Sequence, residues 1–523
     1  NTKTRLYHST LMIQKKKKDS RQISYPKNGK DFGMWYQEVL LKGSLIEYTD
    51  VKGCYVFRPR TMHMWNAIRK MVENEIVQKL DVQETYFPLF ATKQQLEKEE
   101  NHLEGFAPEV AWIQHEKEEN AVAVRPTSET IMYPIYKKWI RSHRDLPLKC
   151  FQWANIVRWE MSHCMPFVRS REFLWHEGHT VFELQQEAED EVDHIIKFYE
   201  QIYEELLAVP VFRGTKTAYE RFAGAEYTKT VEAYIPEVGR AIQGGTSHFL
   251  GQNFSKMFEL EFLDDNNRKT VPFQNSWGLT PRALGTMIMI HSDEQGLVLP
   301  PKISPTEIIV IPLHFKNSDI QALNDAAENM YQMLKSNGFR VLKDMRQDKT
   351  PGYKFSEAEL LGIPLRIEIG PKDLENNTLR LKPRIKDIEP VTESIPSVET
   401  QELFIQKIRT TLDSIQQQLL KNAQANLERS YEVIDNGDME KLVDVIHKNK
   451  KVALVPFCNT EACESSLKNN FKSIAVQYAE DEEEIAAPKS LCVPDFAKTP
   501  SDGTTCINCK EKATTYTLFG YSY

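Results

Sequence analysis

The spacing of apolar residues along this 523-residue chain predicts two helices in its first 300 positions. Over 61–80, TMHMWNAIRKMVENEIVQKL, apolar residues recur every three or four positions, which is the period of an amphipathic helix. Pro59 and Thr61 stand where a helix start favours them. A second apolar stretch, PRALGTMIMIH at 281–291, also favours a helix.

Shorter apolar runs in the same part of the chain favour strands. ETYFPLF at 84–90 predicts a strand that ends at Pro88. Residues 148–183 predict a strand, an Arg-rich turn and a second strand, and FSKMFELEFL at 254–263 and residues 271–277 predict further strands. Long helices beside mostly antiparallel strands indicate an α+β fold for this region.

The pattern changes after Pro300-Pro301, where strand-like and helix-like runs alternate. IIVIPL, an amphipathic helix from Ile320 to Leu334, FRVLKDM, a second helix and PLRIEIG indicate a small α/β domain with a mainly parallel sheet. A long Gln-rich helix then spans about 403–430. We therefore expect a tail and three domains, at 1–32, 33–303, 304–402 and 403–523.

Composition excludes several classes of protein. With 41% apolar and 27% charged residues, the chain is neither wholly disordered nor collagenous. No apolar run reaches 18 residues, so we expect no membrane span. The net charge of -8 means that any RNA is bound through local patches. Because the chain begins at Asn1 and not at Met, we expect its true start to be missing.

Five of the eight cysteines cluster near the C-terminus. Cys458-x4-Cys463 and Cys506-x2-Cys509 have the spacing of a tetrahedral Cys₄ zinc site, and clustering at one end indicates metal binding in a reducing compartment. Four thiolates leave no open coordination position, so the zinc would be structural. Unpaired buried thiols remain the alternative, and Cys492 is expected to be a packed thiol.

Three arginine-bearing stretches predict a nucleotide triphosphate site. They are Val157-Arg158-Trp159-Glu160, Arg169-Ser170-Arg171-Glu172-Phe173 and Gly278-Leu279-Thr280-Pro281-Arg282. Guanidinium groups bind phosphates through two parallel hydrogen bonds and neutralise their charge. Glu160 could accept from an adenine amino group or carry Mg²⁺, and Phe173 offers a ring for the base to stack on. A P-loop is excluded because no GxxxxGK[ST] sequence occurs.

These stretches resemble motifs 2 and 3 of class II aminoacyl-tRNA synthetases, and the helix at 61–80 resembles motif 1. Within that class the chain is similar to the prolyl enzymes of eukaryotic and archaeal type. The likeness covers roughly 30–523 and rests on Arg125-Pro126-Thr127-Ser128-Glu129-Thr130, REFLWHEGHT, ERFAGAEYT, GRAIQGGTSHFLGQNFSK, GYKFSEAELLGIPLRIEIGPKD and the terminal LFGYSY. It implies a class II catalytic domain, an anticodon-binding domain at 304–402 and a C-terminal zinc-binding α+β domain.

The resemblance also implies an activity, site residues and partners. A proline–tRNA ligase would activate L-proline with ATP and Mg²⁺ and transfer it to the 3′ end of tRNA(Pro). Arg158 and Arg282 would be catalytic, neutralising phosphate charge. Proline would contact Thr127, Glu129, Arg158, Trp175, His179, Phe222 and His248. ATP would contact Arg158, Glu160, Arg169, Ser170, Phe173, Gln243, Thr246, Thr280 and Arg282, with Gln243 near Mg²⁺.

Further expectations follow from the same resemblance. The family implies a homodimer through motif 1 and, together with the cysteine usage, a cytoplasmic protein. The basic strand Leu379-Arg380-Leu381-Lys382-Pro383-Arg384 could contact the anticodon loop, or could be a solvated strand edge. In His176-Glu177-Gly178-His179 the spacing is HExH and not HExxH, so a pocket wall for His179 and a packed or exposed His176 are favoured over a metal pair.

Three rival functions stay open at this point. A threonine enzyme of the same fold would hold zinc in its active site through Cys and His, and no such set flanks the predicted pocket. A catalytically silent, RNA-binding paralogue would usually lack a motif 2 or motif 3 arginine, whereas Arg158, Arg169 and Arg282 are all present. The chain could also be one half of a bifunctional synthetase.

Overall fold

The computed structural model describes residues 22–97, 110–113, 121–159, 164–435, 438–478 and 485–523. The chain divides into two compact units. The first contains residues 1–47, 57–62 and 291–418, and the second contains 48–56, 63–290 and 419–523. The long helix α14 (Gln401–Arg429) belongs to the first unit up to Gln418 and to the second from Leu419.

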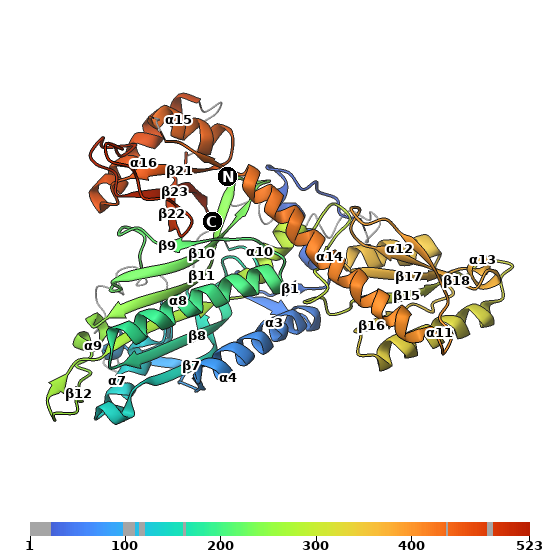
Figure 1. Ribbon diagram of the computed structural model, residues 1–523, viewed down its shortest axis with the longest axis horizontal. Coiled ribbons are helices and arrows are strands. Elements are labelled where there is room, and N and C mark those ends of the chain that lie inside the picture. The colour runs from blue at the N-terminus through green and yellow to red at the C-terminus, as the bar shows by residue number, and fades with distance from the viewer. Residues whose placement is uncertain (1–21, 98–109, 114–120, 160–163, 436–437, 479–484) are drawn as a thin grey trace. The chain divides into compact units, whose positions relative to one another are not determined.

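The second unit is built on a large sheet that is eleven-stranded within the described residues, and Figure 1 labels most of its strands. In spatial order the strands are β20 (Tyr431–Val433), β21 (Val452–Phe457), β23 (Thr515–Ser522), β22 (Lys489–Pro494), β9 (Phe212–Thr215), β10 (Tyr227–Ile235), β11 (Arg240–Gly251), β14 (Phe273–Leu279), β8 (Glu172–Phe182), β7 (Leu148–Val157) and β3 (Gln83–Glu84). From β23 to β7 every neighbouring pair is antiparallel. Strands of the C-terminal segment and of the central segment therefore form one continuous sheet.

Helices and small sheets complete this unit, apart from residues 59–62 and His291 at two helix ends, which belong to the first unit. The helices and helical turns are α3 (Pro59–Val72), a π-helical turn (Glu73–Val77), α4 (Gln78–Leu80), α5 (Lys93–Glu97), α7 (Glu129–Trp139), a 3₁₀ turn (His143–Asp145), α8 (Gln185–Gln201), a π turn (Ile202–Leu206), α9 (Asn253–Met257), α10 (Arg282–His291), α15 (Met439–Val443), a π turn (Asp444–Lys448), α16 (Glu461–Ala475) and a 3₁₀ turn (Val476–Tyr478). Small sheets join β4 (Phe90–Thr92), β6 (Val122–Val124) and β5 (Ala111–Ile113), and β12 (Phe262–Leu263) with β13 (Lys269–Thr270).

The first unit contains the α/β region. It comprises α2 (Phe32–Lys42), β15 (Ile308–Pro312), α11 (Ile320–Ser336), β16 (Val341–Lys343), α12 (Pro351–Leu360), β17 (Leu365–Ile369), α13 (Pro371–Glu375), β18 (Thr378–Pro383) and β19 (Val391–Ser394). Strands β1 (Ile46–Tyr48) and β2 (Tyr55–Phe57) lie where the chain passes between the units. The five-stranded sheet has the order β16-β15-β17-β18-β19.

This sheet is mixed, not mainly parallel as the alternating pattern predicts. The pairs β15–β16 and β15–β17 are parallel, and the pairs β17–β18 and β18–β19 are antiparallel. The cause is local, because the short helix α13 and the turn at Asn377, whose φ is +52°, reverse the chain after β17. A reversal of this kind leaves no room for the crossover that parallel strands need.

Most elements expected from the sequence are confirmed. The helix at 61–80 is present as α3, a π turn and α4, and its apolar side chains Met64, Ile68, Val72 and Ile76 are fully buried. β7 and β8 form the expected strand pair, with Leu148 opposite Val181 and Val157 opposite Glu172. Helix α10 begins at Arg282, and α14 covers the Gln-rich stretch.

Two strand predictions are wrong, at 84–90 and at 254–263. The first strand ends at Glu84, and Thr85 continues the contact with a single backbone bond to Phe151. In the second stretch, α9 and a short strand replace the expected strand. Phe254 and Phe258 are four residues apart and both buried, so the run that suggested strand alternation also fits one turn of helix.

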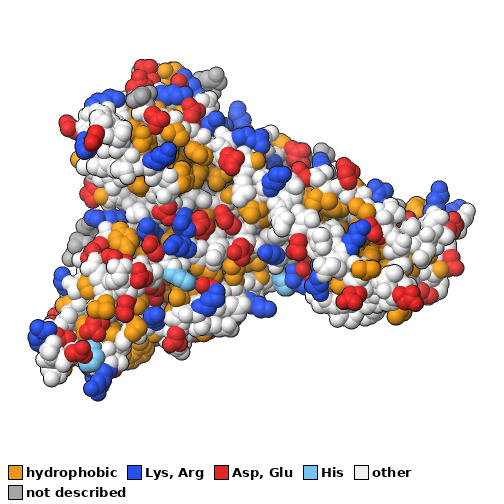
Figure 2. Space-filling model, viewed as in Figure 1, with side chains coloured by type: hydrophobic (Ala, Val, Ile, Leu, Met, Phe, Trp, Pro, Cys, Tyr) orange, Lys and Arg blue, Asp and Glu red, His pale blue; other side chains and the backbone are white. Residues whose placement is uncertain are grey.

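Figure 2 shows acidic and basic side chains interspersed over the face that it draws. The mixture agrees with the modest net charge of -8. Surface charge therefore gives no broad single-sign field on that face, and function must be sought in local arrangements of side chains.

Candidate active site

A cavity of about 470 Å³ opens over the strands β8, β10, β11 and β14 of the large sheet. All but one of the residues predicted to contact proline or ATP line it: Thr127, Glu129, Arg158, Arg169, Ser170, Phe173, Trp175, His179, Phe222, Gln243, Thr246, His248, Thr280 and Arg282. The exception is Glu160, which lies outside the described residues. Residues from widely separated parts of the chain thus share one cavity large enough for a nucleotide and an amino acid.

The sheet decides which side chains face the cavity. Glu177 and His179 are two residues apart on β8, so they project from the same face, whereas His176 projects from the other. On β11 an extra residue, Gly244, stands between the pairs Val231–Gly245 and Glu232–Gln243. This bulge leaves Gln243, Gly244, Gly245 and Thr246 all bordering the cavity.

Two guanidinium groups are fixed at the wall by main-chain oxygens. Arg158 Nε donates to the carbonyl of Pro126 at 3.1 Å, and its guanidinium lies 5.7 Å and 5.8 Å from the ring centres of Phe173 and Trp175. Arg282 Nε donates to the carbonyl of Val168 at 3.0 Å. Burial lowers the pKa of Arg282, which stays protonated because an arginine pKa is so high. These cations suit a polyanionic ligand.

A buried carboxylate lies elsewhere on the wall. Glu129 is 3% exposed, begins helix α7, and accepts a short hydrogen bond from the Thr127 hydroxyl. Among the described residues, no lysine or arginine forms an ion pair with it. A buried carboxylate is costly without a cation, so a ligand that brings an ammonium group would be bound favourably here.

An aromatic pair forms another part of the wall. The rings of Phe222 and His248 stack with centres 4.5 Å apart, and Phe222 comes from the loop between β9 and β10. Thr228 holds both partners: its hydroxyl accepts from the Phe222 amide at 3.0 Å and bonds His248 Nδ1 at 2.9 Å. The pair presents a flat apolar surface that suits a small ring or aliphatic side chain.

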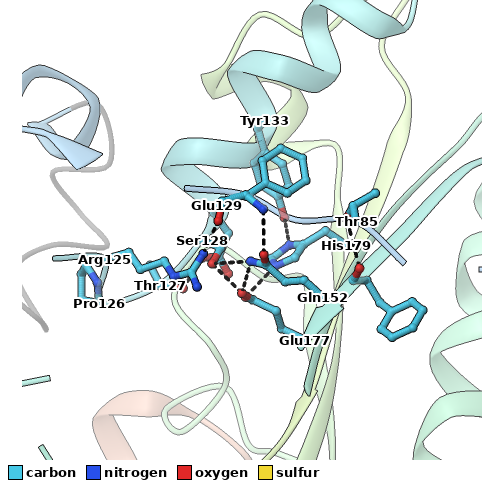
Figure 3. Close-up of polar contacts among 12 residues, drawn as sticks. Thr85, Arg125, Pro126, Thr127, Ser128, Glu129, Tyr133, Gln152, Glu177 and His179 are labelled. Atoms are coloured by element: carbon cyan, nitrogen blue, oxygen red, sulfur yellow. Dashed lines mark hydrogen bonds and ion pairs between the residues drawn. The ribbon is translucent and has the colours of Figure 1, made fainter. Parts of the chain in front are cut away.

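A hydrogen-bond network lies beneath the cavity, and Figure 3 shows its members pointing toward one another. Glu177 Oε1 accepts from Ser128 at 2.5 Å and from Gln152 at 2.6 Å, and Glu177 Oε2 lies 3.1 Å from His179 Nε2. Tyr133 holds the other ring nitrogen of His179 at 2.9 Å. The network fixes the His179 ring from both sides.

Charge and burial oppose each other in this network. Burial alone would raise the pKa of Glu177, but hydrogen bonds from His179 and Ser128 outweigh it, and the pKa is lowered. Burial likewise would lower the pKa of His179, but the carboxylates of Glu177 and Glu129 outweigh it, and the pKa is raised. His179 Nε2 and Glu177 Oε2 lie 3.1 Å apart at the floor of the cavity, and the two pKa shifts favour the charged form of each group.

His176 takes no part in the cavity. It is fully buried on the other face of β8, between Trp153 and Trp277, whose ring centres lie 4.6 Å and 5.1 Å away. Neither ring nitrogen has a hydrogen-bond partner, and burial lowers the pKa of His176 to about 3. It is a packed neutral histidine, one of the two placements expected, and it forms no metal pair with His179.

The sequence interpretation missed several residues of the wall. Glu177, Glu220, Thr228 and Ser276 line the cavity without having been singled out. Strand alternation could have indicated Glu177, since it lies two positions before His179 on the same strand. Glu220 opens the stretch ERFAGAEYT, but neither its type nor its spacing indicates that the loop between β9 and β10 brings it to the cavity.

The four C-terminal cysteines meet, far from these residues in sequence. The sulfur atoms of Cys458, Cys463, Cys506 and Cys509 all lie within 4.8 Å of one another. Cys463 and Cys506 are 3.7 Å apart, as are Cys458 and Cys509, so no disulfide joins them. Burial raises the pKa of Cys463 and of Cys506, whereas hydrogen bonds with Thr460 outweigh burial and lower the pKa of Cys458. The set fits tetrahedral zinc, and Cys492 is buried apart from it as expected.

Three family models match the chain in succession. The tRNA synthetase class II core domain (G, H, P, S and T) matches 112–291, an anticodon binding domain matches 307–411, and the prolyl-tRNA synthetase C-terminal domain matches 439–523. The cytoplasmic proline--tRNA ligase of Arabidopsis thaliana is 43% identical over 95% of this chain and 90% of its own length. The chain belongs to the prolyl-tRNA synthetase family.

Other relatives agree. The proline--tRNA ligase of Encephalitozoon cuniculi is 42% identical over 95% of this chain and 98% of its own length. The crystal structure of prolyl-tRNA synthetase from Cryptosporidium parvum complexed with L-proline and AMP superposes with a TM-score of 0.85 at 41% identity, covering 97% of this chain and all of that one. The class II synthetase core and the anticodon-binding domain expected from the sequence are thereby confirmed, and the family is one of aminoacyl-tRNA ligases.

The described helices include none with the length and hydrophobicity needed to span a membrane.

Proposed function

We propose that this chain joins L-proline to tRNA(Pro) in two steps within the cavity of β8, β10, β11 and β14. Proline and ATP first give prolyl-adenylate and pyrophosphate, and a hydroxyl of the terminal adenosine of the tRNA then takes the prolyl group and releases AMP. Attack of a carboxylate on the α-phosphorus joins two anions, so the catalytic contribution is mainly positioning and charge neutralisation. The chain needs no side-chain nucleophile for this, and none is proposed.

Arg158 and Arg282 are the catalytic residues in this proposal. Arg158 lines the cavity together with Thr127, Phe173 and Trp175, so its guanidinium is placed where it could bridge the proline carboxylate and the α-phosphate. Arg282 would meet adenine or the γ-phosphate. Both side chains are already held by main-chain carbonyls, which supports preorganisation for anionic ligands.

The proline pocket is proposed at Glu129 and the stacked pair of Phe222 and His248. The secondary ammonium of proline has two N–H donors, and Glu129 with Thr127 offers acceptors for both. The pyrrolidine ring would lie against Phe222 and His248, with Trp175 and His179 completing the pocket. The buried carboxylate of Glu129, which forms no ion pair with a lysine or arginine in the described part of the chain, is the observation that carries this assignment.

ATP is proposed to bind Arg158, Glu160, Arg169, Ser170, Phe173, Gln243, Thr246, Thr280 and Arg282. Three cations on the wall favour the triphosphate, and the Phe173 ring could stack on adenine. Mg²⁺ prefers oxygen ligands and usually binds through substrate phosphates with few protein groups. The carboxamide of Gln243 on the cavity wall fits such a role. Bound Mg²⁺ would supply further neutralisation of phosphate charge.

The proposed domain limits are 1–32, 33–303, 304–402 and 403–523, with tRNA meeting the third. Arg384, directly after the basic strand β18, is buried and bonded to Asp293 at 2.6 Å, so we assign it no tRNA contact. Arg380 is exposed and Lys382 is half-buried two positions along, on the same face of the strand. We assign anticodon contact to these two residues.

A structural zinc at the four cysteines, a homodimer and a cytoplasmic location complete the proposal. The sulfur cluster supports the zinc site, because four nearby thiols match the ligand number and type of structural zinc. The name of the plant relative supports the location. The family resemblance of the helix at 61–80 to motif 1 supports the dimer.

ATP–pyrophosphate exchange by the purified chain, without tRNA, against all twenty amino acids tests the proposed function. Exchange that depends on proline and is lost in Arg158→Ala would support both the adenylate chemistry and the substrate. Exchange with another amino acid would retain the fold and refute the pocket assignment. Exchange with none of the twenty amino acids would favour the alternative, a catalytically silent protein that binds RNA.

A further inference from the structure

The loop between β9 and β10, residues 216–226, brings two side chains to the cavity and is held from outside by the C-terminal segment. Glu220 and Phe222 line the cavity. The contacts of this loop on its outer side go to α16 and to the residues just before it. That helix begins two residues before Cys463, so the cysteine cluster lies at its first turn.

Glu464 makes the deepest of these contacts. Its carboxylate is completely buried and accepts from the Thr217 hydroxyl at 2.8 Å through one oxygen and from Ser490 at 2.7 Å through the other. Ser490 belongs to β22, which is paired with β9 at the start of the loop. Glu464 therefore ties the helix, the sheet and the loop together at one point.

Lys468, one helical turn further on, reaches a residue of the cavity wall itself. Its ammonium group donates to Glu220 at 2.8 Å, lies 3.5 Å from Glu464, and is 3.9 Å from the ring centre of Tyr219. The Lys468 and Glu220 side chains are only 17% and 21% exposed. A charge pair this far from solvent is screened weakly and holds its geometry better than a surface pair.

A weaker hydrogen bond also joins the loop to the residues just before α16. The amide of Ala218 donates to Asn459 Oδ1 at 3.4 Å. On its inner side the loop is fixed through Phe222, whose amide donates to Thr228 and whose ring stacks on His248. The loop is thus clamped between the hairpin of β10 and β11 and helix α16.

We infer that Glu464 and Lys468 are positioning residues for amino-acid binding, since they hold the loop that presses Phe222 against the proline pocket. This inference rests on the proposed function, because it assigns proline to that pocket. Neither residue touches the cavity, so each acts through Thr217, Glu220 and the loop. The effect should be confined to the amino acid, since ATP is assigned to residues of β8, β11 and the segments around Arg169 and Arg282.

Replacement of Lys468 by methionine tests the inference, because it keeps the chain length and removes the charge. We expect the KM for proline in ATP–pyrophosphate exchange to rise by about fivefold or more, since small displacements of a positioning contact weaken binding strongly. The KM for ATP should stay within about twofold of wild type. Lys468→Arg should restore most of the affinity, because it keeps a cation beside Glu220.

Lys472→Met is the matched control, since Lys472 is exposed on the same helix one turn further on. Hydrogen exchange of the amides of 217–222 provides a readout that does not depend on activity, and Lys468→Met should raise it while Lys472→Met leaves it unchanged. Glu464→Gln should act in the same direction, and the exchange measurement remains informative if that variant is less stable.

Equal KM values for proline in Lys468→Met and Lys472→Met, with unchanged hydrogen exchange at 217–222, would overturn the inference. A parallel rise of both KM values would also overturn it, because general loosening of the unit is then the cause. Failure of the proposed function is a separate result. It would be seen as wild-type protein that gives no proline-dependent exchange.

Discussion

Arg158 and Arg282 are prepared for anions by different means. Arg158 donates to the Pro126 carbonyl and lies against the faces of Phe173 and Trp175, whereas Arg282 is half-buried and donates to the main-chain oxygens of Val168 and Gln243. In both cases a main-chain oxygen orients the guanidinium at the cavity wall. A lysine carries a single ammonium in place of the planar fork, so it cannot keep such a bond and also offer two parallel donors to a phosphate.

Arg158→Lys should therefore behave almost as badly as Arg158→Ala. We expect kcat/KM for proline in exchange to fall by about 100-fold or more, since removal of one preorganised donor typically costs that much. Arg144→Lys is the control, because Arg144 is exposed at a short helical turn. A lysine variant with at least half of the wild-type rate would show that charge alone is sufficient.

The Glu177–His179 pair predicts a pH dependence of stability. His179 has a raised pKa in the folded protein, so its contribution is complete below its ordinary value of about 6.5 and is lost as pH rises through the folded pKa. Glu177 has a lowered pKa, so its contribution is present above about 4.5 and is lost as pH falls. Both contributions to stability are therefore present between about pH 4.5 and pH 6.5.

Thermal unfolding of wild type and Glu177→Gln should show this window. Without the carboxylate, burial dominates and His179 loses its raised pKa. We expect the difference in Tm between the two proteins to be largest near pH 5.5 and to shrink as the pH is raised toward 9. A difference that grows with pH would contradict the ion pair.

At the scale of elements, β8 separates two environments with a single strand. Glu177 and His179 face the cavity, and His176 and Gly178 face an aromatic layer. Gly178 is there because Trp277 lies across it: a Cβ on Gly178 would come within 2.0 Å of the Trp277 ring. The tryptophan and the glycine together bring β14 and β8 to their observed register, with Trp277 opposite Gly178.

Gly178→Ala should therefore destabilise the large sheet. Overpacking a buried site typically costs about 1–3 kcal/mol, which corresponds to a fall in Tm of several degrees. Gly352→Ala is the control, because a Cβ there meets nothing within 4 Å and the residue is helical. We expect that variant to be unchanged or slightly stabilised. Equal Tm values for wild type and Gly178→Ala would refute the packing account.

The cysteine cluster, which includes Cys463 in the first turn of α16, is predicted to bind zinc. Protein purified from zinc-supplemented medium should contain about one zinc per chain by mass spectrometry, and Cys463→Ser should lose most of it and unfold at a lower temperature. Cys54→Ser should keep the metal, since Cys54 lies outside the cluster. Wild-type protein without zinc, with a Tm insensitive to chelators, would favour the free thiols instead.

Elements with a long apolar repeat could be predicted from the sequence, and short ones could not. Helices 61–80 and 403–430 were found because the buried stripe persists over several turns. The strand prediction for 254–263 was wrong because the spacing of Phe254 and Phe258 fits both a helical turn and a strand. Their packing against Tyr133 in the core favours the helix, and the sequence pattern does not show that packing. The prediction of a mainly parallel sheet in the α/β region was wrong because one turn, at Asn377, reverses the chain.

At the scale of the whole chain, the cavity wall comes from segments between Thr127 and Arg282 that the fold of the large sheet brings together. Residue types and local spacing indicated a phosphate site, but they could not show that Glu129, Phe222 and Arg158 share one cavity. The family resemblance supplied that grouping. It did not indicate Glu177 or Glu220, because their places depend on strand orientation and on contacts with α16.

Charging of tRNA with radioactive proline is the most direct test of the central claim. The purified chain, with ATP, Mg²⁺ and tRNA(Pro), should make acid-precipitable prolyl-tRNA, and Arg158→Ala should not. A tRNA whose 3′-terminal ribose has been oxidised by periodate should remain uncharged. Proline-dependent pyrophosphate exchange without any charging of intact tRNA(Pro), or charging with another amino acid in place of proline, would contradict the account.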